Sequence, residues 1–289
     1  MTDPSTGLPG CVRHPDRPTA LRCTRCERPA CPACLRDAAV GQQCVDCVNE
    51  GRTAVRQPTT VAGARLRGQA VLVPALIVVN LALFAVTAYQ AQSIANNARS
   101  DLFQDWAMAP GLVAFTGEWW RLLTAGFMHI GPLHLAVNMV SLWLIGRDLE
   151  RLLGPVRFFA LYFLSMVGGN LAVFLFGELG QPVAGASTAL YGLMGCYLVA
   201  IVRLKLDPRP ILITLGINVF ITFTVTNISI LGHFGGLVAG VLASAAIFYA
   251  PARNRNQWQT GTLLALTVLL IALFVTRDQQ LVSLIQSGA

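Results

Sequence analysis

Residues 185–205, GASTALYGLMGCYLVAIVRLK, form an apolar run that has Ser187 near its start and ends on Arg203 and Lys205. From Ser187 onward the run is long enough to cross a bilayer core, which needs about 20 apolar residues in a helix. Six further runs of similar length and character occur in the chain. The sequence therefore predicts an all-α polytopic membrane protein with spans at 70–92, 133–153, 156–176, 187–205, 210–226, 231–250 and 258–276.

The composition of the chain agrees with a membrane protein. Of its 289 residues, 54% are hydrophobic and 12% are charged, and the mean hydropathy is +0.58. Soluble globular domains carry about 25% charged residues, so the composition excludes a single soluble domain, and it also excludes a disordered or collagen-like chain. The net charge of +7 is too dilute for a nucleic-acid-binding protein, and we expect no nucleic-acid partner.

The stretch 93–132, between the first two predicted spans, is interpreted as a loop that lies in the membrane interface. It holds Trp106, Trp119 and Trp120 among apolar residues, and Trp side chains prefer the interface. Charged residues, proline and glycine interrupt its apolar pattern. The alternative interpretation is one additional span in this stretch.

A cysteine-rich segment precedes the spans. Its seven Cys and one His fill two tetrahedral zinc sites without remainder, and the short spacing lets one turn supply both ligands of a pair. The odd number of Cys argues against the alternative, a disulfide scaffold. From the spacing alone, the pairs can share a metal serially or alternately. The pairs are Cys11 and His14, Cys23 and Cys26, Cys31 and Cys34, and Cys44 and Cys47.

This spacing resembles that of a B-box-type zinc finger, and the resemblance covers roughly residues 11–47. The resemblance implies that alternate pairs share a metal. Both sites would be full, so we expect two structural Zn²⁺, no cofactor for catalysis, and a module that binds a protein partner or places the protein in the cell. The implied sets are Cys11, His14, Cys31 and Cys34 on one zinc, and Cys23, Cys26, Cys44 and Cys47 on the other.

Basic residues near the ends of the spans predict their orientation, because cytoplasmic ends carry an excess of Lys and Arg. With the N-terminus inside, 12 such residues lie inside and three outside. The N-terminus is therefore expected in the cytoplasm and the C-terminus outside, and thiols in that reducing compartment bind metal rather than pair. The inside residues are Arg52, Arg56, Arg65, Arg67, Arg147, Arg151, Arg157, Arg203, Lys205, Arg209, Arg253 and Arg255, and the outside residues are Arg99, Arg121 and Arg277.

Polar side chains from three predicted spans lie at one level near the outer surface. His134 and Asn138, within HIGPLHLAVNM at 129–139, are spaced i, i+4 and share one helix face. Ser187 begins the fourth span, and His233 begins the sixth. Taken singly, each has the alternative of a helix cap or a packing residue. Polar groups at membrane depth are costly and tend to face a cavity, so their coincidence indicates a functional site.

These residue types suit acyl transfer. A serine hydroxyl needs a base, and His233 is the candidate base for Ser187. His134, Asn138 and the Ser187 amide, which has no intrahelical partner at a helix start, can donate to a developing oxyanion. Gly185 lets the backbone pass close to a substrate. No acidic residue is placed to orient His233, so the residues indicate a Ser–His dyad rather than a triad.

From about residue 70 to 250 the chain resembles the rhomboid family of intramembrane serine proteases. The motifs that carry the resemblance are WWR at 119–121, HIGPLHLAVN at 129–138, GAS at 185–187 and GHFGGLVAG at 232–240. The resemblance implies a six-helix core to which a seventh span is appended. The chain then divides into a zinc-binding module (1–50), a linker (51–69), the rhomboid core (70–250), and the seventh helix with a short tail (251–289).

The resemblance also implies roles for individual residues. Ser187 matches the nucleophile and His233 the general base. His134, Asn138 and the Ser187 amide match the oxyanion donors. Tyr191 matches a family tyrosine that packs against the catalytic histidine.

Further residues match structural positions of the family. Trp120 and Arg121 match a pair in the first loop, and Glu150 with Arg151 matches a stabilising position on the inner face. Thr188 departs from the pattern, since the residue after the nucleophile is commonly glycine in the family. This difference bears on the shape of the pocket or the entry of the helix and removes no catalytic group.

The family implies a substrate class, namely single-span membrane proteins that enter from the lipid bilayer and are cut in or near the membrane. Two alternatives stay open: a catalytically silent rhomboid-like protein that binds membrane clients, and a zinc-sensing receptor or transporter. The preference for Arg, 20 against one Lys, points to a GC-rich bacterial genome. We therefore expect a multi-pass protein of the bacterial inner membrane.

Overall fold

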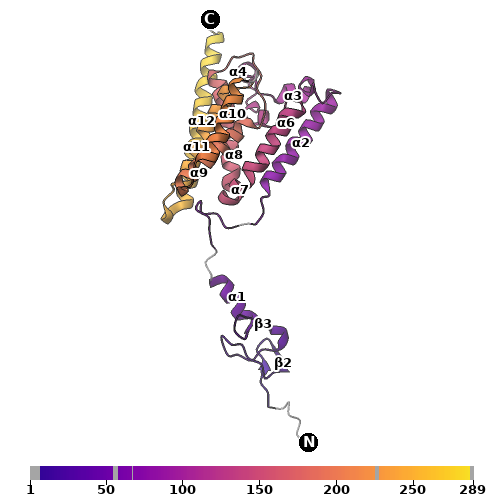
Figure 1. The fold of residues 1–289 in the computed structure, drawn as a ribbon, viewed down its shortest axis with the longest axis vertical. Coiled ribbons are helices and arrows are strands. Elements are labelled where there is room, and N and C mark those ends of the chain that lie inside the picture. Colours follow the sequence, from indigo (N-terminus) through magenta and orange to yellow (C-terminus); the bar gives the residue numbers. More distant parts are fainter. Residues whose placement is uncertain (1–6, 55–57, 67, 225–227, 287–289) are drawn as a thin grey trace. The chain divides into compact units, whose positions relative to one another are not determined.

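The computed structural model describes residues 7–54, 58–66, 68–224 and 228–286. The chain divides into two compact units, Met1–Pro58 and Thr59–Ala289, which Figure 1 draws as a small N-terminal body and a helical bundle. Arg56 and Arg67, two of the charges used for the orientation, lie outside the described residues.

The N-terminal unit is built from two small antiparallel hairpins and one helix. The buried hydrophobic cluster of this unit consists of cysteines together with Ala30 and Leu35. So small an apolar core is a weak source of stability, and domains of this size commonly depend on metal ions or cross-links. The elements are β1 (Gly10–Cys11) with β2 (His14–Pro18), β3 (Leu35–Asp37) with β4 (Gln42–Cys44), and α1 (Val45–Ala54).

The second unit is a helical membrane bundle. Five of its described helices are long and apolar enough to cross a bilayer, and each coincides with a predicted span. The last of them is longer than the predicted 258–276 and begins directly after a short turn at Ala252–Asn254. These helices are α2 (Leu72–Gln90), α8 (Pro155–Phe176), α9 (Ser187–Leu204), α11 (Ile230–Phe248) and α12 (Arg255–Gln286).

The two other predicted spans are also helical, each with a departure from a simple rod. The predicted span 133–153 is a helix interrupted by a π-helical turn, and it is bent by 93° from the short helices Arg121–Phe127 that precede it. The helix α10 (Arg209–Thr224) is apolar but shorter than the others. The chain is thus a mostly helical polytopic membrane protein with about six spans. The interrupted helix consists of α6 (Gly131–Ser141), the turn Leu142–Gly146 and α7 (Arg147–Leu153).

The stretch 93–132 folds into short helices and turns. Among its described residues none of the helices is long enough to span a membrane, which agrees with a loop and not with an additional span, and the place of this loop in the membrane interface stays a prediction. Pro110 begins one of these helices and Gly117, in a left-handed conformation, ends it. The helices are α3 (Asp101–Trp106), α4 (Pro110–Thr116) and α5 (Arg121–Thr124), with single turns at Asn97–Arg99 and Ala125–Phe127.

Helices α9 and α11 pack closely because glycines line their contact. A Cβ atom at Gly236 would overlap the carbonyl group of Thr188, and one at Gly240 would overlap the backbone of Gly192. Small residues at such contacts let two membrane helices approach until their backbones touch. This approach brings the start of α9, with Ser187, close to the start of α11, with His233.

A buried glutamate holds the start of the first span. Glu150 of α7 is 3% exposed, and its carboxylate accepts hydrogen bonds from the backbone N–H groups of Val71, Leu72 and Val73 at 2.7, 2.9 and 2.9 Å. The first N–H groups of a helix have no intrahelical partner and form the positive end of its dipole. Glu150 therefore caps α2 from a different helix.

A buried glutamine ties α12 to the segment that leads into the bundle. The side-chain amide of Gln259 donates to the carbonyl groups of Ala62 and Ile247 at 3.0 and 2.9 Å, and its oxygen accepts from Arg157 at 2.6 Å. Thr60 adds a hydrogen bond to the Leu152 carbonyl at 2.6 Å. Residues 59–66, called the juxtamembrane segment below, are thus part of the membrane unit.

Candidate active site

The serine lies at the first residue of a helix. Helix α9 begins at Ser187, and the first backbone hydrogen bond of the turn runs from Leu190 to the Ala186 carbonyl at 3.0 Å. The Ser187 amide therefore remains free of the helical ladder, as expected at a helix start. The serine is half-buried and lies in the first turn of α9.

The histidine lies near the start of α11, directly across from the serine. Ser229 caps this helix by accepting a hydrogen bond from the Gly232 amide at 3.0 Å. His233 is 7% exposed, and its Nε2 atom lies 2.8 Å from the Ser187 hydroxyl oxygen. The ring of Tyr191 stacks on the imidazole, with centroids 4.1 Å apart and planes inclined by 20°. The structure thus brings Ser187, His233 and Tyr191 together.

The segment before the serine is held in place by the interfacial loop. Met108 and Val183 exchange backbone hydrogen bonds of 2.8 and 2.7 Å, and the Gly185 amide donates to the Ala125 carbonyl at 3.0 Å. These contacts hold the backbone on both sides of Ala184. They explain how a segment outside the helices delivers Ser187 in a defined position.

His134 lies beside Gly185 with a fixed ring orientation. The Ile130 amide donates to His134 Nδ1 at 3.2 Å, so in the neutral ring Nε2 carries the proton and is a donor. Gly185 has φ +133°, and a Cβ atom there would lie 2.8 Å from His134 Nε2 and 3.5 Å from the Ser187 hydroxyl oxygen. Only glycine suits this position, since it allows this backbone conformation and leaves the space open.

Asn138 is buried one turn below His134 on the same helix. Its side-chain nitrogen donates to the His134 carbonyl at 2.8 Å. An amide nitrogen has two N–H groups, so one remains for another acceptor. His134 and Asn138 thus lie on one face of α6, as their spacing predicted.

A threonine that the sequence analysis did not single out also contacts the histidine. Thr222 of α10 is 3% exposed, and its hydroxyl oxygen lies 2.8 Å from His233 Nδ1 and 2.5 Å from the Tyr191 hydroxyl. Helix α10 carries several threonines, including Thr214 and Thr224. No signal in the sequence distinguishes the one that faces the site.

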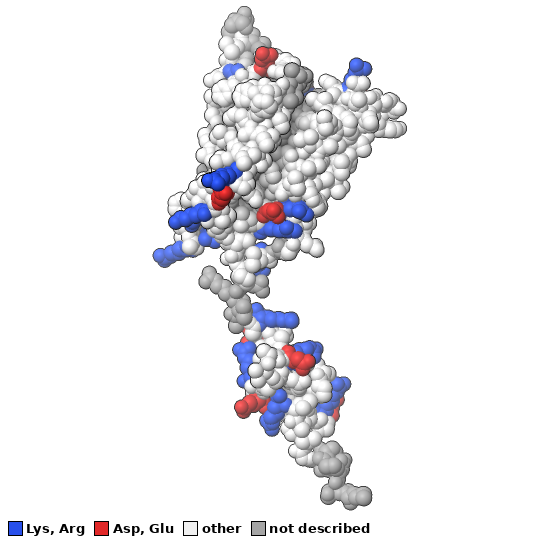
Figure 2. Space-filling model, viewed as in Figure 1, with Lys and Arg blue, Asp and Glu red and all other residues white. Residues whose placement is uncertain are grey.

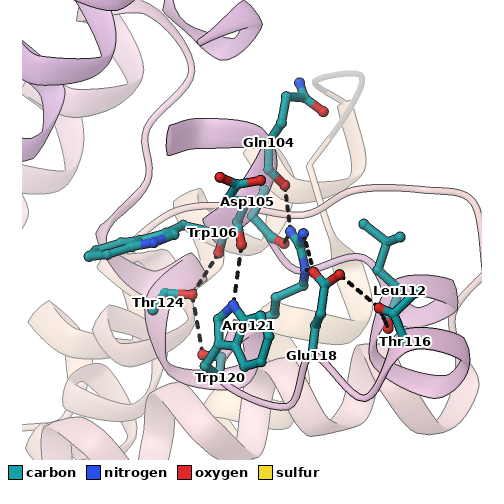
Figure 3. Close-up of polar contacts among 10 residues, drawn as sticks. Gln104, Asp105, Trp106, Leu112, Thr116, Glu118, Trp120, Arg121 and Thr124 are labelled. Atoms are coloured by element: carbon teal, nitrogen blue, oxygen red, sulfur yellow. Dashed lines mark hydrogen bonds and ion pairs between the residues drawn. The ribbon is translucent and has the colours of Figure 1, made fainter. Parts of the chain in front are cut away.

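Trp120 and Arg121 lie in the interfacial loop rather than at the serine (Figure 3). The Arg121 guanidinium is buried; it pairs with Glu118 and donates to the carbonyl groups of Gln104 and Ala107. The Trp120 indole donates to the Asp105 carbonyl at 3.4 Å. The two residues thus tie the short helices α3 and α5 together.

Glu118 completes this loop network. It accepts a hydrogen bond from Thr116 at 2.7 Å. That bond and the neighbouring Arg121 hold the pKa of the Glu118 carboxyl below its usual value. The carboxylate is therefore the favoured form, which keeps the ion pair with the buried guanidinium.

Thr188, which replaces the glycine common in the family, is buried in a notch between helices. A Cβ atom at Gly169 would lie 2.7 Å from the Thr188 Cβ, and one at Gly232 would lie 3.2 Å from its methyl group. The larger side chain is accommodated because both neighbouring helices carry glycine there. It leaves the distance between Ser187 and His233 within hydrogen-bonding range.

The cysteines and His14 of the N-terminal unit form two tetrads. Within each tetrad the ligand atoms lie within 4.8 Å of one another, and the pairs alternate rather than following in series. The sets are Cys11, His14, Cys31 and Cys34, and Cys23, Cys26, Cys44 and Cys47, as the B-box resemblance implies.

The geometry of both tetrads fits a tetrahedral metal ion. Zinc–sulfur bonds of about 2.3 Å give tetrahedron edges of about 3.8 Å. The Cys26 and Cys44 sulfurs are 3.8 Å apart, and His14 Nδ1 lies 3.9, 3.5 and 3.2 Å from the sulfurs of Cys11, Cys31 and Cys34. These distances leave room for one ion at the centre of each set.

The surrounding protein shifts the pKa values of two thiols of one tetrad in opposite directions. A hydrogen bond from the Cys31 backbone is the main cause that lowers the pKa of Cys11 to about 6. Burial, followed by the neighbouring thiols of Cys11 and Cys31, raises the pKa of Cys34 to about 11. A bound cation would bring both thiols to the thiolate form, because metal ligation deprotonates every coordinating thiol.

The membrane bundle and the paired serine and histidine at its helix starts define a class, that of membrane-embedded proteins with a Ser–His site. Residues 116–250 match the model of the Rhomboid domain. The chain belongs to the rhomboid family of proteases.

Curated relatives support this assignment. The chain is 41% identical to rhomboid protease GluP of Bacillus subtilis over 164 residues, which is 55% of this chain and 31% of GluP. It is 35% identical to the putative rhomboid protease YdcA of the same organism over 50% of this chain and 74% of YdcA. It is also 30% identical to inactive RHOMBOID-like protein 8 of Arabidopsis thaliana, over 46% of this chain and 40% of that protein. The family therefore includes inactive members.

Proposed function

We propose that this protein is an intramembrane serine endopeptidase in which Ser187 is the nucleophile and His233 the general base. The observation that carries the proposal is the 2.8 Å separation between the Ser187 hydroxyl oxygen and His233 Nε2. A hydroxyl at this distance can pass its proton to the imidazole as it attacks a carbonyl group. The relatives that are named rhomboid proteases support the same reaction.

The oxyanion in this proposal is held by donors around Gly185. His134 Nε2 carries a proton and lies beside the open space at Gly185, close to Ser187. The Ser187 amide and the second N–H of Asn138 complete the set. Fixed donors of this kind stabilise the charge that develops in the transition state without reorganisation.

The proposed reaction proceeds through an acyl-enzyme. The Ser187 oxygen bonds to the scissile carbonyl carbon, its proton passes to His233 Nε2, and the imidazolium then protonates the departing amine as the C–N bond breaks. A water molecule next gives a proton to His233 as its oxygen bonds to the acyl carbon, and the imidazolium then returns that proton to the Ser187 oxygen as the acyl C–O bond breaks, which regenerates the site. The proposed substrates are single-span membrane proteins that enter from the lipid bilayer.

The N-terminal unit in this proposal holds two structural Zn²⁺, one in each tetrad. Zinc ligation supplies folding free energy to small domains, and this unit buries little apolar surface besides its cysteines. We assign it no part in the chemistry. Its proposed role is to bind a protein partner or to place the enzyme.

The proposed location is the cell membrane of a bacterium, with the N-terminus in the cytoplasm and the C-terminus outside. Figure 2 shows the Lys and Arg side chains of the membrane unit concentrated toward one end, with a largely uncharged band beside them. An excess of basic residues at one end favours the cytoplasmic side for that end. The bacterial relative GluP supports the cell membrane.

The test is cleavage of a single-span membrane substrate by the purified wild type and by Ser187→Ala in detergent. We expect the wild type to cleave and to react covalently with a fluorophosphonate probe, and we expect Ser187→Ala to do neither while melting at the same temperature. Ser165→Ala is the matched control, because its hydroxyl is buried in α8 and donates to the Leu161 carbonyl in its own helix. A well-folded wild type that binds the substrate without cleaving it, and that resists the probe, would favour a silent membrane-client binder.

A further inference from the structure

We propose that Thr222 is a positioning residue for His233, which it holds in the tautomer whose Nε2 atom can take the Ser187 proton. The inference rests on the proposed protease function and deepens it. It replaces the Ser–His dyad read from the sequence with a chain of four hydrogen-bonded side chains. The chain runs from Ser187 through His233 to Thr222 and Tyr191.

The hydroxyl of Thr222 has three neighbours. It donates to the Asn218 carbonyl one turn earlier in α10 at 2.8 Å, and it lies 2.8 Å from His233 Nδ1 and 2.5 Å from the Tyr191 hydroxyl. A threonine hydroxyl has one proton to donate and two lone pairs that accept. Because the Asn218 carbonyl takes the proton, both lone pairs remain for the two other partners.

This number of donors and acceptors at Thr222 favours one tautomer of His233. If Nδ1 carries the proton, Nδ1–H and the Tyr191 hydroxyl both donate to Thr222, and Thr222 donates to Asn218, so every group is satisfied. Nε2 is then a bare lone pair that accepts the Ser187 hydroxyl at 2.8 Å. If Nε2 carried the proton, Thr222 would have to turn its own proton to Nδ1, and the contact with the Asn218 carbonyl would be lost. The arrangement therefore favours the form that a general base requires.

The same contact stabilises the charged ring formed during the reaction. When His233 accepts the serine proton, both of its nitrogens become donors, and hydrogen bonds from charged donors are stronger than those between neutral groups. Among the contacts described for His233, a threonine oxygen backed by Tyr191 occupies the place beside Nδ1. The neutral hydroxyl of Thr222 thus takes the place that the acidic side chain has beside the histidine of a Ser–His–Asp triad.

Burial marks Thr222 out from the other residues of its helix. The described residues of α10 are mostly exposed, and Thr222 and Ile211 are the buried ones. Thr224, two residues later, is exposed and makes the same type of hydrogen bond to the carbonyl four residues before it, Phe220, at 2.8 Å. A shared backbone contact therefore does not explain the position of Thr222, and Thr224 is a matched control.

The kinetic test compares Thr222→Val, Thr222→Ser and Thr224→Val with the wild type, all in the full chain and with one single-span substrate. Valine keeps the shape of threonine and removes the oxygen. We expect Thr222→Val to lower kcat by about tenfold to a hundredfold, the range for a hydrogen bond to a charged group, with little change in KM. Thr222→Ser should restore kcat to within about threefold of the wild type, and Thr224→Val should match the wild type. A Thr222→Val protein with wild-type kcat, or a serine variant as slow as the valine variant, would overturn the proposal.

The tautomer itself can be measured in the resting wild type. Nitrogen-15 NMR of histidine-labelled protein separates protonated from bare ring nitrogens, and His233→Gln assigns the signals among the four histidines. We expect Nδ1 of His233 to be protonated in the resting wild type and the population to move toward Nε2–H in Thr222→Val. A resting ring that carries its proton on Nε2 would overturn the proposal.

The two measurements also separate this inference from the proposed function. A wild type that neither cleaves nor reacts with a fluorophosphonate would contradict the protease assignment, and the tautomer would still decide whether Thr222 positions the ring. An active wild type with an unaffected Thr222→Val variant would leave the protease assignment intact and overturn the role of Thr222.

Discussion

At the scale of single residues, the candidate site depends on a glycine without a side chain as much as on its polar side chains. Gly185 leaves the space between His134 and the Ser187 hydroxyl open, and its backbone takes a conformation that side chains disfavour. The Ile130 amide fixes the ring of His134, the proposed oxyanion donor, and the Ala125 carbonyl holds the Gly185 amide. In the proposed mechanism, this space admits the substrate carbonyl to His134 and Ser187.

Gly185→Ala should abolish most of the cleavage activity. The added Cβ atom would meet His134 Nε2 at 2.8 Å, so the imidazole or the backbone must move, and loss of one oxyanion donor costs about 10²–10³-fold in kcat. The measurement is kcat on a single-span substrate, beside the melting temperature. Gly180→Ala is the control, because the space around Gly180, in the same connection between α8 and α9, is open. Equal activity of the two variants would show that the open space has no role.

The sequence analysis singled out four polar residues of the candidate site and did not single out Thr222. Ser187, His233, His134 and Asn138 stood out because polar groups at the same depth of several spans are costly. A threonine in an apolar helix usually bonds a carbonyl of its own previous turn, and Thr222 does so as well. Which threonine also faces the histidine depends on how α10 is rotated, and periodicity within so uniformly apolar a helix does not fix that rotation.

At the scale of elements, the start of the first span is held by a carboxylate from another helix. Only 17% of the most apolar 18-residue stretch of α2 is buried inside the bundle. Most of this helix is therefore left for lipid to contact. The Glu150 carboxylate accepts hydrogen bonds from three consecutive N–H groups at the start of the helix. A charged acceptor at a helix N-terminus also interacts favourably with the helix dipole.

Glu150→Ala should lower the free energy of unfolding by about 2–3 kcal/mol, because it leaves buried donors without an acceptor. Glu150→Gln keeps one acceptor oxygen and should lie between alanine and the wild type. The measurement is thermal or denaturant unfolding in detergent. Asp148→Asn is the control, since Asp148 is exposed in the same helix and pairs only with Arg151 on the surface, and such pairs contribute little. A Glu150→Ala protein as stable as Asp148→Asn would contradict the capping role.

Hydropathy predicted where the helices lie and not how they bend. The span at 133–153 appears in the sequence as one apolar run, but its helix contains a π-helical turn and meets the preceding short helices at 93°. The short helices before the bend are held by the hydrogen bonds of Arg121 with Gln104 and Ala107. Those partners lie more than ten residues away in the chain, so a window of hydropathy does not detect them.

At the scale of the whole molecule, the chain joins two units that are stable for different reasons. The membrane unit has buried apolar clusters and close helix contacts, whereas the N-terminal unit buries mainly its cysteines. The Cys and His spacing was enough to predict two sites of four ligands each, because each ligand pair is local in sequence. The serial and alternating pairings remained open from the spacing, since that choice depends on how the hairpins pack.

Removal of metal should unfold the N-terminal unit and leave the membrane unit unchanged. We expect the purified chain to contain two Zn²⁺, and a strong chelator should make residues 7–54 sensitive to protease because zinc ligation is coupled to folding. The membrane unit should keep its melting temperature and its cleavage activity. Metal analysis, limited proteolysis and the cleavage assay measure these outcomes, and restored zinc should reverse them. Loss of cleavage on chelation would contradict a purely structural role for the metal.

The contact between Gln259 and Ala62 has a consequence for the order of biosynthesis. The two residues are 197 positions apart, and a ribosome adding about 5–20 residues per second needs roughly 10–40 s to make that length of chain. Throughout this interval the juxtamembrane segment has been translated, but its glutamine partner does not yet exist. The Gln259 contact of this first part of the membrane unit is therefore among the last to form, so in a nascent chain stalled before α12 the hydrogen bond from Thr60 to Leu152 would have to hold the segment without it.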